Sequence, residues 1–531
     1  MREEELPYTR DYRLQNVLKC VQCGKCTGTC TASTIYYLAR KEGREIGEVY
    51  NPRKITALLR EHPGLTYTGG PLAEQKSLLE RLFDISECVQ CGLCELQCPK
   101  GNSPRDLIKY FQELNADGAA PHPFREEWLK HGCVNDKLIL QILPLSNPHK
   151  GRELTEAAIR ELNDLISNAG RYNLAPPREN HRVRTSGTTE EVSEVFLFQG
   201  CSGATAYRGM EIGARYLLDH LGIKIHVSDA QTCCGGVPFN INELTLREKL
   251  LVNARNLAVM EEMLSNTHSH TVIGTCATCV QSSVEVKNML SNEQNKRAIN
   301  GRLSTVGKHV DGDLTIQHIA ELLHTNLDRI KENVAVRLKG LKVAIHSGCH
   351  AREVTGEKIN HKLHDLVEAT GATVVDYPLE MQCCGSGPKI FKDSFAGNKN
   401  VGILYTVPSG PNWRDFWGGS SWFYINRANP FGLGGRQLRF VSGSLRQTAE
   451  KFKSMVCAGA NMIVVDCPGC EKTFDKNQGI ISKKIGRTYG LPTSHIAEFL
   501  AIAMGADHTE IFNAQYHSVP IEPVLELYDL I

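Results

Sequence analysis

Two segments of the chain read EVFLFQGC (residues 194–201) and KVAIHSGC (residues 342–349). Each is an apolar run of strand length that ends at a cysteine. A helical pattern and a second short strand follow each run, at residues 206–221 and 223–227 and again at residues 357–370 and 373–375. Strands that alternate with helices predict a parallel sheet covered by helices on both faces.

The same order of cysteines follows both segments, so the second half of the chain is an internal repeat. The first copy continues with CCGG, TVIGTCATC and HIAELL, and the second with CCGSG, MIVVDCPGC and HIAEFL. Five cysteines recur in each copy, namely Cys201, Cys233, Cys234, Cys276 and Cys279, then Cys349, Cys383, Cys384, Cys467 and Cys470. Ligands gather at the carboxyl ends of parallel strands, where these cysteines lie. Five converging thiolates exceed the four of an ordinary cubane, and we predict a nonstandard iron–sulfur site.

The first hundred residues carry the motif C-x2-C-x2-C-x3-C twice, at residues 20–30 and 88–98. This spacing is typical of two-cluster ferredoxins, in which the fourth cysteine ligates the other cluster. Structural zinc, the alternative, is usually bound by separated pairs of cysteines. We therefore predict two [4Fe–4S] cubanes, one held by Cys20, Cys23, Cys26 and Cys98 and the other by Cys88, Cys91, Cys94 and Cys30.

Prolines that begin helices, and a connector that follows them, indicate how the chain is divided into domains. A helix that begins at a proline follows each ferredoxin-type motif, at Pro52 and at Pro104. The stretch after them reads as a connector, in which we expect Cys133 to be a free thiol. The predicted fold is an α+β multidomain protein. Its parts are a helical two-cluster ferredoxin-like domain (1–125), a helical connector (126–190) and two pseudo-repeated α/β domains with parallel sheets (191–335 and 336–531).

Composition excludes several classes of protein. The 531 residues include 60 basic and 59 acidic side chains, a balance that argues against a nucleic-acid binder. The opening residues MREEELPYTR lack the apolar core of a signal peptide, and no apolar run approaches the ~18 residues of a membrane span. We expect a cytoplasmic protein, either free or held at the inner face of the membrane by a partner subunit. The chain has 20 cysteines, and in this setting cysteines are expected to serve as metal ligands more often than to form disulfides.

The repeated pattern Cys…Cys-Cys-Gly…Cys-x-x-Cys resembles the CCG domain of heterodisulfide reductase catalytic subunits. The front part resembles the small two-cluster subunit of that enzyme, and the fused order resembles the D-type catalytic subunit of its membrane-associated form. The resemblance implies a noncubane [4Fe–4S] cluster in each CCG domain, with a heterodisulfide split between them. All five ligand positions are intact in both copies, which favours chemistry at paired clusters over electron transfer alone.

Disulfide reduction needs two electrons, and each cluster supplies one at a time. The two cubanes would transfer electrons to the paired clusters. The product thiolates also need protons, and His350 next to Cys349 is the candidate catalytic donor. Its alternative role is a hydrogen bond to a cluster sulfide or the backbone. His346, His318 and His495 are expected to pack in the core.

The resemblance implies the coenzyme M–coenzyme B disulfide as substrate, as in methanogens. One alternative is the catalytic subunit of a sulfite-reduction membrane complex acting on a protein-borne disulfide or trisulfide. Another is an electron-transfer subunit of a glycolate, lactate or glycerol-3-phosphate dehydrogenase. The sequence shows no flavin fingerprint, so no flavin is expected in this chain. Electrons would come from a partner in a hetero-oligomeric complex, either a membrane cytochrome b or a flavin-bearing subunit.

The second copy contains an insertion. The CC pair and the C-x-x-C motif are separated by 41 residues in the first copy and by 82 in the second. The excess, at about 390–438, carries Trp413, Trp417 and Trp422 among many glycines. An irregular loop is expected there, acting as a substrate lid, a docking face or only a surface loop, unless it is an error in the sequence.

Overall fold

The computed structural model describes most of the repeated half of the chain and part of the N-terminal region. The described residues are 12–15, 19–30, 33, 52–61, 91–116, 123–133, 152–170, 174–175, 192–205, 207–240, 243–356, 358–385, 401–404, 423–426, 436–485, 488–512 and 517–531.

Each repeat unit is built on a four-stranded parallel sheet, which confirms the predicted architecture. The first unit contains β1 (Glu194–Phe198), β2 (Lys224–His226), β3 (Thr271–Gly274) and β4 (Thr315–His318), in the order β2-β1-β3-β4. The second contains β5 (Lys342–His346), β6 (Thr373–Val374), β9 (Met462–Val465) and β10 (Thr493–His495), in the order β10-β9-β5-β6. Read from its β6 edge, the second sheet has the order β6-β5-β9-β10, so each strand occupies the position of its counterpart in the first sheet.

Helices connect and cover these strands. In the first unit they are α12 (Cys201–Ala204), α13 (Arg208–His220), α14 (Gly236–Asn240), α15 (Leu246–Leu264), α16 (Ala277–Leu290), α17 (Glu293–Leu303), α18 (Ile319–Thr325) and α19 (Leu327–Glu332). In the second unit they are α20 (Cys349–Thr355), α21 (Lys358–Ala369), α24 (Arg436–Cys457), α25 (Pro468–Ile485), α26 (Ile496–Ala503), α27 (His508–Phe512) and α28 (Glu522–Leu527). Short 3-10 turns lie at η3 (Tyr12–Gln15) and η5 (Ser304–Val306).

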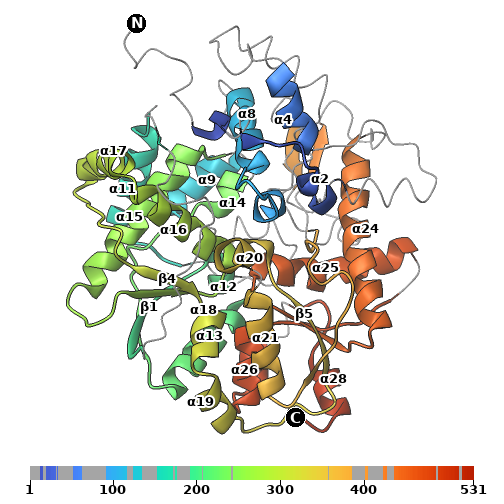
Figure 1. The fold of residues 1–531 in the computed structure, drawn as a ribbon. Coiled ribbons are helices and arrows are strands. Elements are labelled where there is room, and N and C mark those ends of the chain that lie inside the picture. Colours follow the sequence, from blue (N-terminus) through green and yellow to red (C-terminus); the bar gives the residue numbers. More distant parts are fainter. Residues whose placement is uncertain are drawn as a thin grey trace, which may run out of the picture.

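The N-terminal region is helical and lies over one end of the two sheets (Figure 1). It contains α2 (Lys25–Thr29), α4 (Pro52–Glu61), α7 (Leu93–Leu96) and α8 (Pro104–Ala116), and the two expected proline-started helices begin at the predicted residues. The predicted connector supplies α9 (Pro123–His131) and α11 (Glu156–Ser167). It is not a loose linker, because Trp128, Leu162 and Cys133 are buried in the core of the first unit.

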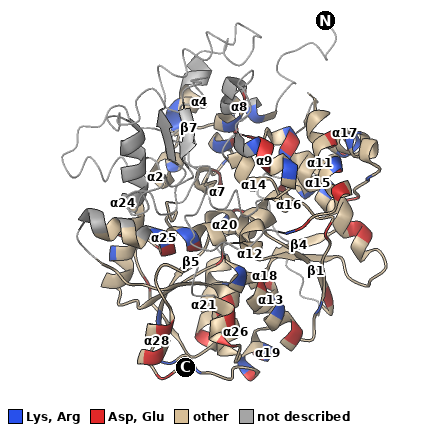
Figure 2. Cartoon of the chain, turned by 180° about the vertical axis from the view of Figure 1, so that it is seen from behind, with Lys and Arg blue, Asp and Glu red and all other residues tan. Residues whose placement is uncertain are grey.

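Most of the predicted insertion lies outside the described residues, including Trp413, Trp417 and Trp422. Within it the structure describes an antiparallel pair, β7 (Val401–Leu404) with β8 (Phe423–Asn426), and the start of α24. A role as a lid or docking face therefore stays a prediction. In the described part of the chain no helix is long and apolar enough to cross a membrane. Basic and acidic side chains are interspersed over the helices (Figure 2), in keeping with the near-zero net charge.

The two repeat units are packed together through α13 and α26. A Cβ added to Gly213 of α13 would lie 2.7 Å from the carbonyl oxygen of Ala497, and one added to Gly209 would lie 1.7 Å from the carbonyl oxygen of Ile511. Only residues without a side chain permit this approach of backbone to backbone. The Tyr216 hydroxyl also donates a hydrogen bond of 3.1 Å to the Met504 carbonyl across the same interface.

We expect Gly213→Ala to lower the free energy of unfolding by about 1–3 kcal/mol, because the new methyl group forces α13 away from α26. Gly301→Ala is the matched control, since Gly301 lies in α17 with nothing within 4 Å of its added Cβ. Denaturant titration of both variants checks this. Equal stability of the two variants would contradict the close packing of the repeat units.

Candidate iron–sulfur site

The five repeat cysteines of the first unit come from three points of the fold. Cys201 begins α12 directly after β1, the adjacent pair Cys233 and Cys234 precedes α14, and Cys276 and Cys279 lie at the start of α16. Side-chain hydrogen bonds connect their thiols in the order Cys201, Cys233, Cys234, Cys279, Cys276.

The second unit repeats this arrangement. Cys349 begins α20 directly after β5, and Cys467 and Cys470 lie at the start of α25. The thiols are hydrogen-bonded in the order Cys349, Cys383, Cys384, Cys470, Cys467. The carboxyl ends of both parallel sheets therefore carry a group of five thiols, as the sequence predicts for each copy separately.

The two groups meet at one junction, which sequence spacing does not reveal. The thiol of Cys276 is hydrogen-bonded to that of Cys467, so all ten thiols form one continuous row. A Cβ added to Gly348 would lie 3.1 Å from the Cβ of Cys467 and 3.6 Å from the Cβ of Ala277. The absence of a side chain at Gly348 thus leaves room for Cys467 within the second unit, and Ala277 of the first unit lies at an ordinary contact distance from the same point.

Backbone amides and neighbouring thiols favour the ionised form of particular cysteines. The amides of Gly236 and Gly385 donate hydrogen bonds of 3.4 Å to the sulfurs of Cys234 and Cys383. The hydrogen bond from Cys233 is the main cause that holds the pKa of Cys234 well below its usual value. The hydrogen bond from Cys349 has the same effect on the pKa of Cys383.

The donor set fits iron–sulfur clusters. Thiolates are the ligands these clusters require, and N–H donors to sulfur are a common means of adjusting their potentials. In the second unit the buried ring of His346 also indicates a bound group. Neither of its nitrogens has a hydrogen-bond partner among the described residues. One ring nitrogen lies within 4.8 Å of the sulfurs of Cys384 and Cys470. A buried polar group aimed at two cysteines is consistent with a group bound between them.

Cys98 of the second ferredoxin-type motif lies near cysteines of the first motif. Burial raises the pKa of Cys26, and repulsion from Cys20 and Cys98 adds to the shift, so the three thiols are close neighbours. The sulfur of Cys20 accepts a hydrogen bond of 3.3 Å from the Thr56 hydroxyl, and that of Cys98 one of 3.3 Å from the Asn102 amide. The exchange of fourth cysteines between the two clusters stays a prediction. Cys23 is exposed, Cys30 and Cys94 are half-buried, and Cys88 lies outside the described residues.

The second ferredoxin-type motif lies against the second repeat unit. The hydrogen bond to Cys383 and burial raise the pKa of Cys349, and repulsion from Cys91 contributes, so Cys91 lies near the start of α20. Arg105 of α8 holds the two parts together. Its guanidinium is 2.7 Å from the Glu353 carboxylate of α20 and 3.2 Å from that of Glu95 in α7, and all three side chains are at most 10% exposed.

His350 stands at the junction of the two units. Its Nδ1 shares a hydrogen bond of 2.9 Å with the hydroxyl of Thr278, which lies between Cys276 and Cys279. Hydrogen bonds from Cys276 and Cys470 hold the pKa of Cys467 well below its usual value, and His350 contributes to this shift. The role of Thr278 could not be predicted from the sequence, because its partner belongs to the other repeat.

Two buried cations near the second thiol group carry no motif and were also missed. The ammonium of Lys451 donates to the carbonyls of Glu380 and Gln382, at 3.2 and 2.9 Å, and burial lowers its pKa to about 7. The guanidinium of Arg352 donates to the carbonyl of Met381 at 2.6 Å. Both therefore fix the loop that leads into the Cys383–Cys384 pair.

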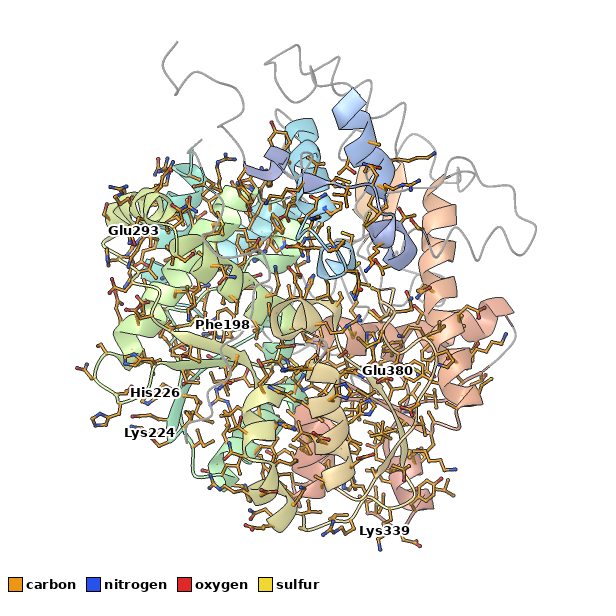
Figure 3. The ribbon with its side chains drawn as sticks, viewed as in Figure 1. Phe198, Lys224, His226, Glu293, Lys339 and Glu380 are labelled. Carbon is orange, nitrogen blue, oxygen red and sulfur yellow. The ribbon has the colours of Figure 1, made fainter. Side chains whose placement is uncertain are left out.

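At the position of His346 the first unit has Phe198, which ends β1 (Figure 3).

The remaining predicted residues are placed as follows. His318 and His495 are fully buried, which confirms the expected core packing, and each also caps a helix by accepting from the amide of Ala320 or Ala497. Cys133 is a buried thiol whose pKa burial raises to about 11, as expected for an unreactive cysteine. Cys457, for which the sequence predicts no role, is exposed at the end of α24.

Parts of the chain are similar to known protein families and to curated proteins. Residues 16–102 match the family model of the 4Fe-4S dicluster domain, and residues 195–282 and 343–395 match that of the cysteine-rich CCG domain. The B-type subunit of the ferredoxin:CoB-CoM heterodisulfide reductase of Methanosarcina acetivorans is 25% identical over 63% of this chain and 95% of its own length. The C-type subunit of that reductase is 27% identical over 18% of this chain and 29% of its own length. The glycolate oxidase iron-sulfur subunit of Escherichia coli is 23% identical over 72% of this chain and 83% of its own.

We expect Arg105→Ala to cost about 3 kcal/mol or more of unfolding free energy, because it leaves the buried carboxylates of Glu95 and Glu353 without their cation. Arg215→Ala is the control. Arg215 forms a comparable pair with Glu211 at 2.9 Å but is 40% exposed, so we expect a loss below about 0.5 kcal/mol. Denaturant titration compares them, and similar small losses would show that the buried ion pair does not hold the dicluster region in place.

Proposed function

We propose that this chain, a fused dicluster and CCG-domain subunit related to the B-type and C-type subunits of heterodisulfide reductase, is the iron–sulfur catalytic subunit of a disulfide reductase. The observation that carries the proposal is the continuous row of ten thiols across the junction of the two repeat units. A disulfide at that junction would be flanked by two metal sites. The proposed substrate is the coenzyme M–coenzyme B disulfide, because the enzymes to which the B-type relatives belong are named for it.

Four clusters are proposed. Two cubanes would be held by the eight ferredoxin-type cysteines, with Cys98 and Cys30 exchanged between the motifs. Two noncubane [4Fe–4S] clusters would be held by the ten repeat cysteines, five in each unit. When bound, such clusters supply single electrons to the substrate.

The protein's own residues would supply position, charge and protons. His350, fixed by Thr278 at the junction, would donate a proton from its imidazole to a product thiolate. Arg352 and Lys451 would add positive charge beside the second thiol group, where negative charge gathers on reduction. Burial of the Cys383–Cys384 pair would keep water away from the reacting sulfur atoms.

Electrons would enter from a partner subunit at the first ferredoxin-type motif. Cys23 is exposed there, and the neighbouring Val21 is 55% exposed, an apolar side chain suited to an interface. The path would run to the second motif and from Cys91 to the second repeat unit through Cys349. The partner would be a membrane cytochrome b or a flavin-bearing subunit.

A second candidate function is electron transfer alone, as a subunit of a glycolate or lactate dehydrogenase. Similarity to the glycolate oxidase iron-sulfur subunit over 83% of its length favours it. Two complete sets of five cysteines in contact with each other favour disulfide chemistry instead. A protein-borne disulfide or trisulfide, as in a sulfite-reduction complex, is the remaining alternative substrate.

We expect Cys234→Ala and Cys383→Ala each to abolish disulfide-dependent oxidation of reduced viologen, because each removes a proposed ligand and one interior link in the row of thiols. Cys457→Ser is the matched control and should keep full activity, since its thiol is exposed and outside the row. The assay is run anaerobically, with iron and sulfide contents measured for every variant. Full activity in either alanine variant would refute the paired-cluster mechanism.

We expect His350→Gln to reduce turnover about 10²-fold or more and to remove one limb of the pH–rate profile, because glutamine cannot donate a proton in this range. Thr278→Val should slow turnover less while keeping that limb, since it removes only the hydrogen bond to the ring. Turnover numbers measured from pH 5 to 9 test both. An unchanged profile in His350→Gln would assign the proton to another group.

A further inference from the structure

A second group of buried ligand-type side chains lies in the second repeat unit, apart from the row of thiols. Glu471 comes from the first turn of α25, Glu498 from the first turn of α26, and His517 from the segment before α28. One carboxylate oxygen of each glutamate and one ring nitrogen of His517 all lie within 4.8 Å of one another.

These polar atoms are not satisfied by the surrounding protein. Among the described residues, both carboxylate oxygens of Glu471, Oε1 of Glu498 and Nδ1 of His517 have no hydrogen-bond partner outside the cluster. The two glutamates are 0% exposed and His517 is 9% exposed. An unpaired ionised carboxylate in such a place is strongly unfavourable, so a cation or a proton is required.

Lys476, a basic residue of α25, already has an acidic partner. It lies 3.0 Å from Oδ2 of Asp475, the next acidic residue along α25. The other oxygen of Asp475 accepts hydrogen bonds from the amides of Ser518 and Val519, at 2.6 and 3.1 Å. Asp475 therefore has its own partners, and it ties the segment that bears His517 to α25.

The internal repeat shows that the fold does not need this cluster. The position after the fifth repeat cysteine is Val280 in the first unit and Glu471 in the second. Glu321 and Glu498 occupy equivalent places in the two capping boxes, but the second carboxylate oxygen of Glu321 lies 3.5 Å from Lys362. In the second unit a buried carboxylate and an imidazole are added at this point.

Space beside the cluster is kept open by a glycine. A Cβ added to Gly209, at the start of α13, would lie 2.6 Å from Oε1 of Glu498. The ring of Tyr207 meets that of His517 edge-on at 5.9 Å. The cluster thus lies where the first unit, α25, α26 and the C-terminal segment come together.

We propose that Glu471, Glu498 and His517 bind one divalent first-row transition metal ion, for which Zn²⁺ is the probe. Carboxylate and imidazole ligands suit such ions, and two carboxylates with a neutral imidazole balance the charge of the ion. The ion would cross-link α25, which begins beside Cys467, to α26 and to the C-terminal segment. This inference stands apart from the proposed activity, because no cluster cysteine belongs to the site.

The test uses the full, cluster-loaded chain, equilibrated anaerobically with Zn²⁺, freed of excess metal, and analysed for zinc, iron and sulfide. Glu471→Val installs the residue found at that position in the first unit. Glu498→Gln keeps an oxygen for the capping box. Glu321→Gln is the matched control, because it alters the equivalent capping glutamate of the other repeat.

Wild type and Glu321→Gln are expected to retain about one equivalent of zinc more than Glu471→Val and Glu498→Gln, with iron and sulfide the same in all four. Anomalous diffraction at the zinc edge should place that ion among the three side chains. The competing occupant is a proton, since burial raises the pKa of Glu498 to about 8. Equal zinc in wild type and Glu471→Val would overturn the metal site and leave a protonated pair of carboxyl groups. That result would leave the proposed disulfide chemistry untouched, because neither variant removes a cluster ligand.

Discussion

The contact between Cys276 and Cys467 is the constraint on which the rest of the structure depends. It requires the carboxyl ends of two parallel sheets to meet, which in turn requires the repeat units to pack almost backbone to backbone. Gly209 and Gly213 permit this approach between α13 and the second unit. The dicluster region then docks against α20, where Arg105 joins it to Glu353.

Much of this could be predicted from the sequence, because repeated strands and cysteines have strong local signals. The alternation of strands and helices in each unit, the helices that begin at Pro52 and Pro104, and the gathering of five thiols in each copy all follow from pattern alone. The junction could not be predicted, since it depends on how two separately folded sheets pack. The pairing of Thr278 with His350 and the burial of Lys451 were missed for the same reason.

The two repeats share topology but differ in the chemistry around their thiols. The second unit has His346 where the first has Phe198, and Arg352 where the first has Ala204. It also receives the dicluster region, through Cys91 near Cys349. Buried basic side chains and the contact with the dicluster region therefore lie on one side of the junction. This asymmetry suits a reaction in which one sulfur of a disulfide is reduced before the other.

The central claim is that a disulfide is reduced between the two groups of five thiols. The most direct measurement is an anaerobic titration of cluster-loaded protein with reduced viologen and the coenzyme M–coenzyme B disulfide, counting dye oxidised and thiols formed. The account predicts sustained turnover, with two electrons consumed and two thiols released for each disulfide. Absence of turnover in protein whose iron, sulfide and EPR signals show intact clusters would contradict it and favour electron transfer alone.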